Sequence, residues 1–149
     1  DGMRWRGSIV GLVSALNKIG FIPWFAESVT AALSGVSWTV TLAILFLVYL
    51  YSNYAFASLS GHVTGMYAAF LAVAVAAGAP VYLAAIGLAV LSNLMAGLTH
   101  YSTGAAPIFF GAGFVSQKDW WRLGFLCSVI NFAIWIGIGG LWWKFLGIW

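Results

Sequence analysis

Residues 38–65 read WTVTLAILFLVYLYSNYAFASLSGHVTG, a long apolar run that ends in a polar, glycine-containing patch. The run from 38 to 56 is long enough to cross the hydrocarbon of a bilayer as one helix, for which about 20 apolar residues suffice. The patch at 57–65 then brings hydroxyls, a histidine and two glycines into sequence that is otherwise apolar. This predicts a membrane helix that meets an irregular segment at membrane depth.

The composition indicates an integral membrane protein. Only 9 of the 149 residues are charged (6 Lys and Arg, 3 Asp and Glu), whereas soluble domains carry about 25%. Hydrophobic residues make up 63% of the chain, and the mean hydropathy is +1.01. Between Glu27 and Lys118 lie 90 consecutive residues without a charged side chain, enough for up to roughly four membrane passes.

Several other classes of protein are disfavoured. The net charge is only +3 and the sequence has no basic cluster, which argues against nucleic acid as a partner. The single cysteine, Cys127, can form no intrachain disulfide, and the sequence lacks the His and Cys spacing of a metal site. No carboxylate lies between Glu27 and Asp119, so an acid–base or nucleophilic constellation cannot be assembled there. An enzyme is therefore the least favoured interpretation.

The first 37 residues differ from the rest. Lys18 and Glu27 are spaced to face headgroups, and Pro23 would break any single helix through this stretch. Residues 1–37 are therefore predicted to form an interfacial amphipathic arm rather than a span. The chain begins with Asp1 and shows no signal-peptide architecture, so we expect it to be a piece of a longer polypeptide.

The remainder alternates full and short apolar segments, which predicts an all-α, polytopic membrane protein. We expect a re-entrant helical hairpin over 38–77 with its tip near 57–64. A discontinuous helix should follow over 81–115, broken near 98–106, with an apolar second part of about half the length of a span. We then expect a terminal transmembrane helix over 120–143. Irregular chain survives at membrane depth only where protein or a watery cavity surrounds it. Paired interrupted segments of this kind point to the substrate site of a transporter.

At each break a helix is expected to restart, and its first N–H groups have no partner within the helix. Pro107 suits an early position of the second restart because it has no N–H to leave unpaired. Such helix starts attract anions, while exposed carbonyls at the same breaks can instead hold Na⁺. The candidate substrate-binding residues at the two breaks are Ser58, Ser60, Gly61, His62, Thr64, Thr99, His100, Ser102, Thr103, Gly104 and Pro107.

A structural interpretation competes with the functional one at every one of these positions. Ser and Thr in membrane helices commonly bond a carbonyl of their own helix or a neighbouring helix. His62 and His100 each fall inside a break, where a lone histidine is usually a neutral hydrogen-bonding group. A protonated histidine beside a carboxylate substrate would instead supply positive charge, and ionisable groups within a membrane tend to be functional.

Two stretches resemble a known family. Residues 92–107, SNLMAGLTHYSTGAAP, are similar to the second-half signature of the divalent anion:sodium symporter family. Residues 56–67, FASLSGHVTGMY, and the tail from Trp120 resemble the same family. The most similar branch holds the bacterial citrate/succinate and tartrate/succinate antiporters and the plastid 2-oxoglutarate/malate translocator. The resemblance covers essentially the whole chain, which would be the C-terminal part, about a third of a full-length member with inverted repeats.

The resemblance implies a secondary active transporter of di- and tricarboxylates, such as succinate, malate, 2-oxoglutarate, citrate or tartrate. Members are homodimers in which a transport domain moves as an elevator against a scaffold domain. Residues 38–149 would be one inverted repeat, forming half of that transport domain and half of the substrate niche. No cofactor is implied apart from Na⁺.

The sequence departs from the family's Ser-Asn-Thr motif at the hairpin tip. The corresponding stretch here reads Ser58-Leu59-Ser60, with His62 nearby, which argues against Na⁺ coupling and favours exchange of carboxylates. A Na⁺-coupled dicarboxylate symporter stays open as an alternative. A second alternative is a structural membrane subunit that does not transport, in which these residues would be individually dispensable. The residues that would hold Na⁺ in a symporter are Ser58, Ser60, Thr99 and Ser102.

Orientation and localisation follow from charge and from the resemblance. Lys118 and Arg122 in a short loop favour a cytoplasmic position for that loop. The resemblance places the turn at 78–80 and the C-terminus outside. A bacterial inner (plasma) membrane is expected, with the inner membrane of an organelle as the alternative.

Overall fold

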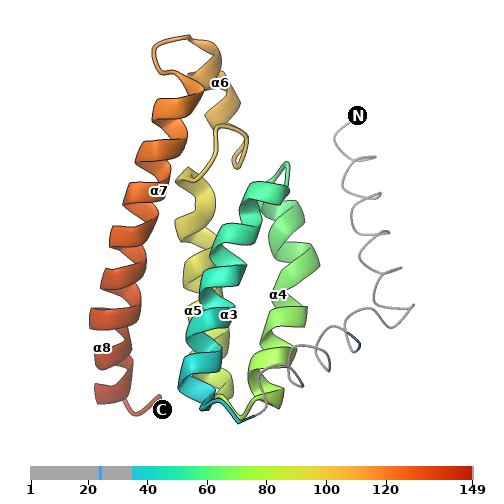
Figure 1. Cartoon of the computed structure of the whole chain (residues 1–149), viewed down its shortest axis with the longest axis vertical. Coiled ribbons are helices and arrows are strands. Elements are labelled where there is room, and N and C mark those ends of the chain that lie inside the picture. The colour runs from blue at the N-terminus through green and yellow to red at the C-terminus, as the bar shows by residue number, and fades with distance from the viewer. Residues whose placement is uncertain (1–23, 25–34, 149) are drawn as a thin grey trace.

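The computed structural model describes Trp24 and residues 35–148. Within these residues every regular element is helical, in agreement with the predicted all-α class (Figure 1). The interfacial arm predicted for residues 1–37 lies outside the described residues except for Trp24 and 35–37.

The first two helices form a hairpin. Helix α3 (Trp38–Ser52) ends in a 3₁₀ turn, η1 (Asn53–Ala55), and helix α4 (Leu59–Ala76) returns beside it. The chain between them is extended, and the hydroxyl of Ser58 accepts a hydrogen bond from the Gly61 amide (3.1 Å) as an N-cap. Helix α4 thus begins at Leu59, inside the stretch 57–64 that was predicted to form the hairpin tip.

A tight turn joins α4 to α5 (Val81–Leu94). Gly78 has a φ of +85°, the left-handed conformation that ends many helices. The Ala79 amide reaches back to the Ala74 carbonyl (3.0 Å), which completes a Schellman motif. Pro80 then precedes α5, which packs against both α3 and α4.

The helix that begins with α5 is interrupted, as predicted. After α5 come a 3₁₀ turn, η2 (Met95–Gly97), an irregular loop over 98–105, and a short helix, α6 (Ala106–Gly111), with Pro107 in its first turn. Helix α6 is shorter than the apolar segment 108–115 expected from the sequence. It stops because the chain turns at Gly113, whose φ is +79°.

The last elements form one continuous helical run. Helix α7 (Gln117–Ala133), a π-helical segment, η3 (Ile134–Gly139), and α8 (Gly140–Phe145) follow one another without a gap. Ser116 caps the start, because its hydroxyl accepts from the Asp119 amide (3.2 Å), and the carboxylate of Asp119 favours the positive end of the helix. This run contains the terminal span predicted at 120–143.

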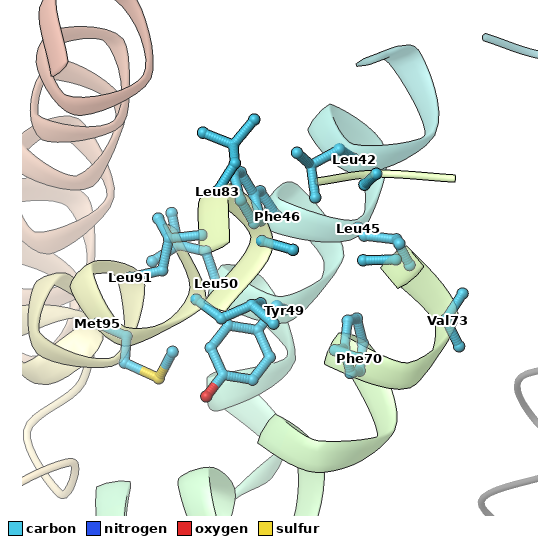
Figure 2. Close-up of a cluster of buried hydrophobic side chains, with 14 of the residues drawn as sticks. Leu42, Leu45, Phe46, Tyr49, Leu50, Phe70, Val73, Leu83, Leu91 and Met95 are labelled. Carbon is cyan, nitrogen blue, oxygen red and sulfur yellow. The ribbon is translucent and has the colours of Figure 1, made fainter. Parts of the chain in front are cut away.

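Three helical runs in the described part of the chain have the length and apolar character of a membrane crossing. They are Trp38–Ala55, Leu59–Ala76 and Gln117–Phe145, with Val81–Gly97 as a shorter apolar helix. The core lies where α3, α4 and α5 meet. Tyr49 and Phe70 are fully buried there, their rings in edge contact, with Leu91 from α5 and Met95 from η2 beside them (Figure 2).

Candidate functional site

The two breaks lie next to each other. The turn η1 at the end of α3 and the turn η2 at the end of α5 are on the same side of the bundle, and α7 runs on beyond both (Figure 1). The amide of Leu59, the first residue of α4, donates to the carbonyl of Ser102 in the second break (2.9 Å). We call the hairpin tip at 56–60 and the loop at 98–105 together the break junction.

The start of α4 leaves one amide available. The Leu59 amide is engaged by Ser102, the Gly61 amide by the Ser58 hydroxyl, and the His62 amide by the Ser58 carbonyl (3.1 Å). Within the described residues the amide of Ser60, the fourth residue of this turn, has no acceptor. The Ser60 side chain is exposed and adds a hydroxyl beside that amide.

The loop of the second break is stabilised from within. The hydroxyls of Thr99 and Ser102 are both buried and lie 2.6 Å apart. The Thr103 hydroxyl accepts from the Ala106 amide (3.2 Å) and so caps α6. Gly104, between these contacts, is exposed, and a Cβ built on it would meet no atom within 4 Å.

His62 lies inside the hairpin rather than on its surface. Its side chain is fully buried, and its ring packs on Tyr49 (4.7 Å between centroids) and Phe56 (4.9 Å). The Ser52 hydroxyl donates to the Tyr49 carbonyl (2.9 Å), so Nε2 of His62 must be the donor in its 2.7 Å bond to that hydroxyl. Nδ1 is then a buried acceptor without a partner in the described structure, and a bound substrate cannot reach the ring in this conformation.

His100 faces a different neighbourhood. Its side chain is half-buried, and its Nδ1 accepts a hydrogen bond from Nε1–H of Trp121 on α7 (3.2 Å). The ring of Phe110 lies 4.3 Å away and that of Tyr101 5.0 Å away. His100 therefore joins the loop to the terminal helix, and the two histidines that looked equivalent in sequence point to separate surroundings.

Asn53 belongs to the break junction, although the sequence did not single it out. Its side chain is fully buried, and its Nδ2 donates to the Ser102 hydroxyl (2.9 Å) and to the Met95 carbonyl (3.3 Å). The hydroxyl of Tyr101 donates to the neighbouring Tyr54 carbonyl (2.8 Å). The available signal was that Asn53 is the sole carboxamide in the apolar run 38–56, directly before the first break.

The predicted site residues thus separate by exposure. Exposed residues are Ser60, Thr64, Gly104 and Pro107. Partly buried residues are Ser58, Gly61, His100 and Thr103. Fully buried residues are His62, Thr99 and Ser102. The exposed set is the part of the predicted site that a ligand could contact in this conformation.

The backbone contributes to the electrostatics of this surface. Residues 35–117 contain no Asp, Glu, Lys or Arg, so within that range the positive end of the 18-residue helix α4 supplies positive potential, and Lys118 and Arg122 follow on α7. In the described part of the chain no three His, Cys, Asp or Glu side chains cluster as a transition-metal site would require. A cation at the junction would depend on hydroxyl and carbonyl oxygens.

A separate apolar cavity does not share this chemistry. It has a volume of about 150 Å³ and lies between α3, α5 and the terminal run, at the opposite end of the bundle from the breaks. Its wall includes the side chains of Trp38, Leu83 and Trp143. A carboxylate would find almost no polar partner there, so the break junction is the better candidate.

The whole chain is similar in sequence to known proteins. A family model described as the sodium:sulfate symporter transmembrane region matches residues 1–149. Dicarboxylate transporter 1 of the chloroplast from Spinacia oleracea is 48% identical over 151 residues, which cover 100% of this chain and 26% of that protein. The putative malate transporter YflS of Bacillus subtilis is 51% identical over 149 residues, 100% of this chain and 31% of that protein.

A less similar relative is named as an antiporter. The citrate/succinate antiporter of Escherichia coli K12 is 36% identical over 143 residues, 95% of this chain and 29% of the antiporter. The chain therefore spans between about a quarter and a third of the length of these curated relatives, all of which are named as transporters. No solved structure matches it.

Proposed function

Because this chain belongs to the sodium:sulfate symporter family of membrane transporters, we propose that it forms part of a carrier for di- and tricarboxylates. The observation that carries the proposal is the break junction, where the Leu59 amide bonds the Ser102 carbonyl and the Ser60 amide and hydroxyl stay available. The names of the relatives, which include dicarboxylate, malate and citrate/succinate carriers, support carboxylates as the substrate class.

The chemistry of the junction suits a carboxylate. An amide and a hydroxyl at a helix start are both donors, and a carboxylate accepts two such bonds. Away from bulk water, these bonds and the dipole of α4 act with less screening. We propose that Ser60 contacts one carboxylate group directly, with Gly104 and Thr64 forming adjacent walls. The residues of an inverted first repeat, in the longer protein, would complete the niche.

We propose exchange of one carboxylate for another as the transport mode. The carboxylate relatives include a named antiporter. In addition, three of the four hydroxyl oxygens that would bind Na⁺ already have hydrogen-bond partners within the protein: Ser58 bonds the Gly61 amide, and Thr99 and Ser102 bond each other.

The moving unit would be the hairpin together with the broken helix. Hydrogen bonds from Leu59 and Asn53 to Ser102, and from Tyr101 to Tyr54, join the two breaks at several points. Elements joined in this way move as one body, as an elevator mechanism in a homodimeric carrier requires. We place the carrier in a bacterial inner membrane or the inner membrane of an organelle.

The second candidate is a Na⁺-coupled dicarboxylate symporter. It is favoured because the matching family is described by its sodium symporters. Reconstitution of the full-length protein in proteoliposomes separates the two modes. Exchange predicts uptake of labelled succinate or malate only when unlabelled carboxylate is inside, with no dependence on a Na⁺ gradient. Uptake that needs Na⁺ and no internal carboxylate would overturn exchange.

The role of Ser60 is tested in the same assay. Ser60→Ala removes the hydroxyl but keeps the amide, so the half-saturating carboxylate concentration should rise at least about tenfold, the effect of one lost hydrogen bond to a charged group. Ser92→Ala is the matched control, because Ser92 is a partly buried serine on α5 that bonds Tyr49 (2.8 Å) away from the junction. Equal behaviour of both variants would contradict the assignment and favour a purely structural role.

A further inference from the structure

Asn53 makes two contacts that cross between elements. It lies in η1, at the end of α3, and both N–H groups of its side chain donate to other elements: one to the Met95 carbonyl in η2 and one to the Ser102 hydroxyl in the loop. Both bonds are buried. One carboxamide therefore links the ends of two parallel helices, α3 and α5, and the irregular chain after the second.

Ser102 is held from two directions by the hairpin. Its carbonyl accepts from the Leu59 amide (2.9 Å), and its hydroxyl accepts from Asn53 (2.9 Å). The next two residues, Thr103 and Gly104, lead to the exposed side of the loop. The position of that side relative to Ser60 therefore depends on how Ser102 is fixed.

The orientation of the carboxamide is defined. The Met95 carbonyl can only accept, so the nitrogen of Asn53 must face it and Oδ1 must face away. Oδ1 is buried and has no partner in the described structure. A buried acceptor without a partner is unfavourable, so Asn53 contributes through its donors and through the geometry that they set.

We propose that Asn53 is a positioning residue of the carrier, which fixes residues 102–104 against the start of α4 and so sets the distance between the two edges of the carboxylate site. The proposal rests on the proposed function for its substrate. The contacts that it invokes are independent of any substrate and can be tested without transport.

The kinetic test uses the full-length protein in proteoliposomes. Asn53→Ala should raise the half-saturating carboxylate concentration about tenfold while maximal exchange stays within about twofold, since a small misplacement weakens binding first. Tyr49→Phe is the matched control. Tyr49 is one turn earlier on α3, fully buried, and its hydroxyl bonds Ser92 on α5 (2.8 Å), so its loss removes a similar bond between the same helices outside the junction.

A labelling test does not require transport. Gly104→Cys, in a background without other cysteines, places a thiol on the exposed loop where a Cβ meets no atom within 4 Å. Asn53→Ala should raise the rate of maleimide labelling several-fold because the loop is no longer held, and Tyr49→Phe should leave that rate unchanged. Equal rates in the Asn53→Ala variant and the parent would overturn the proposal, as would equal effects of the two substitutions.

A double-mutant cycle identifies the route of the effect. Ser102→Ala removes the acceptor of the Asn53 bond, so adding Asn53→Ala should change the labelling rate little further. Additive effects would show that Asn53 does not act through Ser102. If the Asn53→Ala variant does not reach the membrane, Ser102→Ala alone serves as the test, and the same several-fold increase in the labelling rate is expected. Labelling as expected with no carboxylate exchange by the parent protein would overturn the proposed function and leave the positioning contacts supported.

Discussion

The three-helix bundle and the terminal helix are built differently. In the bundle, 39% of the Trp38–Ala55 window is buried within the described structure, and a continuous core fills the space between α3, α4 and α5. In the terminal run, 6% of the corresponding window of Gln117–Phe145 is buried. The apolar side chains of that run face outward, toward lipid or other protein.

The terminal run contacts the bundle near its two ends and, between them, through Phe132 and Ile136, which pack against the core. Near the breaks, Gly124 lies against the backbone of Gly97 and Leu98, and the Tyr51 hydroxyl bonds that of Ser128 (3.3 Å). At the other end, Trp143 is buried beside the apolar cavity. Stability is therefore concentrated in the bundle, whereas the docking of the terminal run depends on a few close contacts.

Truncation in the core should have the largest effect. Phe70→Ala removes a fully buried ring from the bundle and should lower the free energy of unfolding by about 3–5 kcal/mol. Leu126→Ala, on the terminal run, is the control, since its side chain is 54% exposed and its loss should cost about 0.5 kcal/mol or less. Thermal unfolding of the full-length protein in detergent measures both. Similar losses would remove the contrast between the two regions.

The close approach at Gly124 should give the next largest effect. A Cβ at this position would lie 2.7 Å from the Gly97 carbonyl oxygen and 2.9 Å from that of Leu98, and backbone cannot give way as a side chain can. Gly124→Ala should therefore cost about 1–3 kcal/mol and separate α7 from the loop. Gly137→Ala, in the same run with no atom within 4 Å, should be neutral or stabilising. If both substitutions prove neutral, α7 does not dock as described.

Replacing His62 distinguishes packing from charge. Gln can keep a donor for the Ser52 hydroxyl but loses the ring contacts with Tyr49 and Phe56, so His62→Gln should cost about 1 kcal/mol of stability. Carboxylate exchange should stay within about twofold of the parent, because the buried ring does not contact substrate. Unchanged thermal stability with loss of exchange would instead assign His62 a direct role in transport.

The polar contact between the two regions should contribute least. Tyr51→Phe removes the bond to Ser128 and should cost about 0.6 kcal/mol, the average for such bonds between membrane helices. Tyr82→Phe serves as the control because Tyr82 is 76% exposed and lies in the first turn of α5. A loss above about 2 kcal/mol for Tyr51→Phe would mean that the terminal run is held more firmly than its burial indicates.

Much of the fold could be predicted from the sequence because its signals are local. The apolar runs, the glycines of the two patches and Pro107 each act on their own segment of backbone, and the second break occurs where they indicated. The first break lies at 53–58, before most of the predicted patch at 57–65, because Ser58 caps α4 and that helix already begins at Leu59. The resemblance to the divalent anion:sodium symporters, based on residues 92–107, is confirmed by the family match over the whole chain. Re-entry into the membrane, the boundary at residue 37 and the identity of the binding residues stay predictions.

The arrangement of side chains at the junction could not be predicted. In a soluble helix the polar face reveals which side is exposed, but α4 is apolar almost all round, so its pattern did not reveal that His62 points inward. The role of Asn53 could not be predicted for another reason. Its partners, Met95 and Ser102, lie 42 and 49 residues away in sequence, and only the packing of α5 on α3 brings them together.

The charged residues of α7 define how deep the junction lies. After Arg122 the terminal run has no charge until Lys144, and these 21 intervening residues extend about 31 Å, close to the thickness of bilayer hydrocarbon. Gly124, which contacts the second break, is the second residue of that stretch. This spacing predicts that the junction lies near one membrane face, on the side of Lys118 and Arg122. A carboxylate bound at the proposed site would then have a short exit to that compartment and nearly the whole bilayer between it and the other.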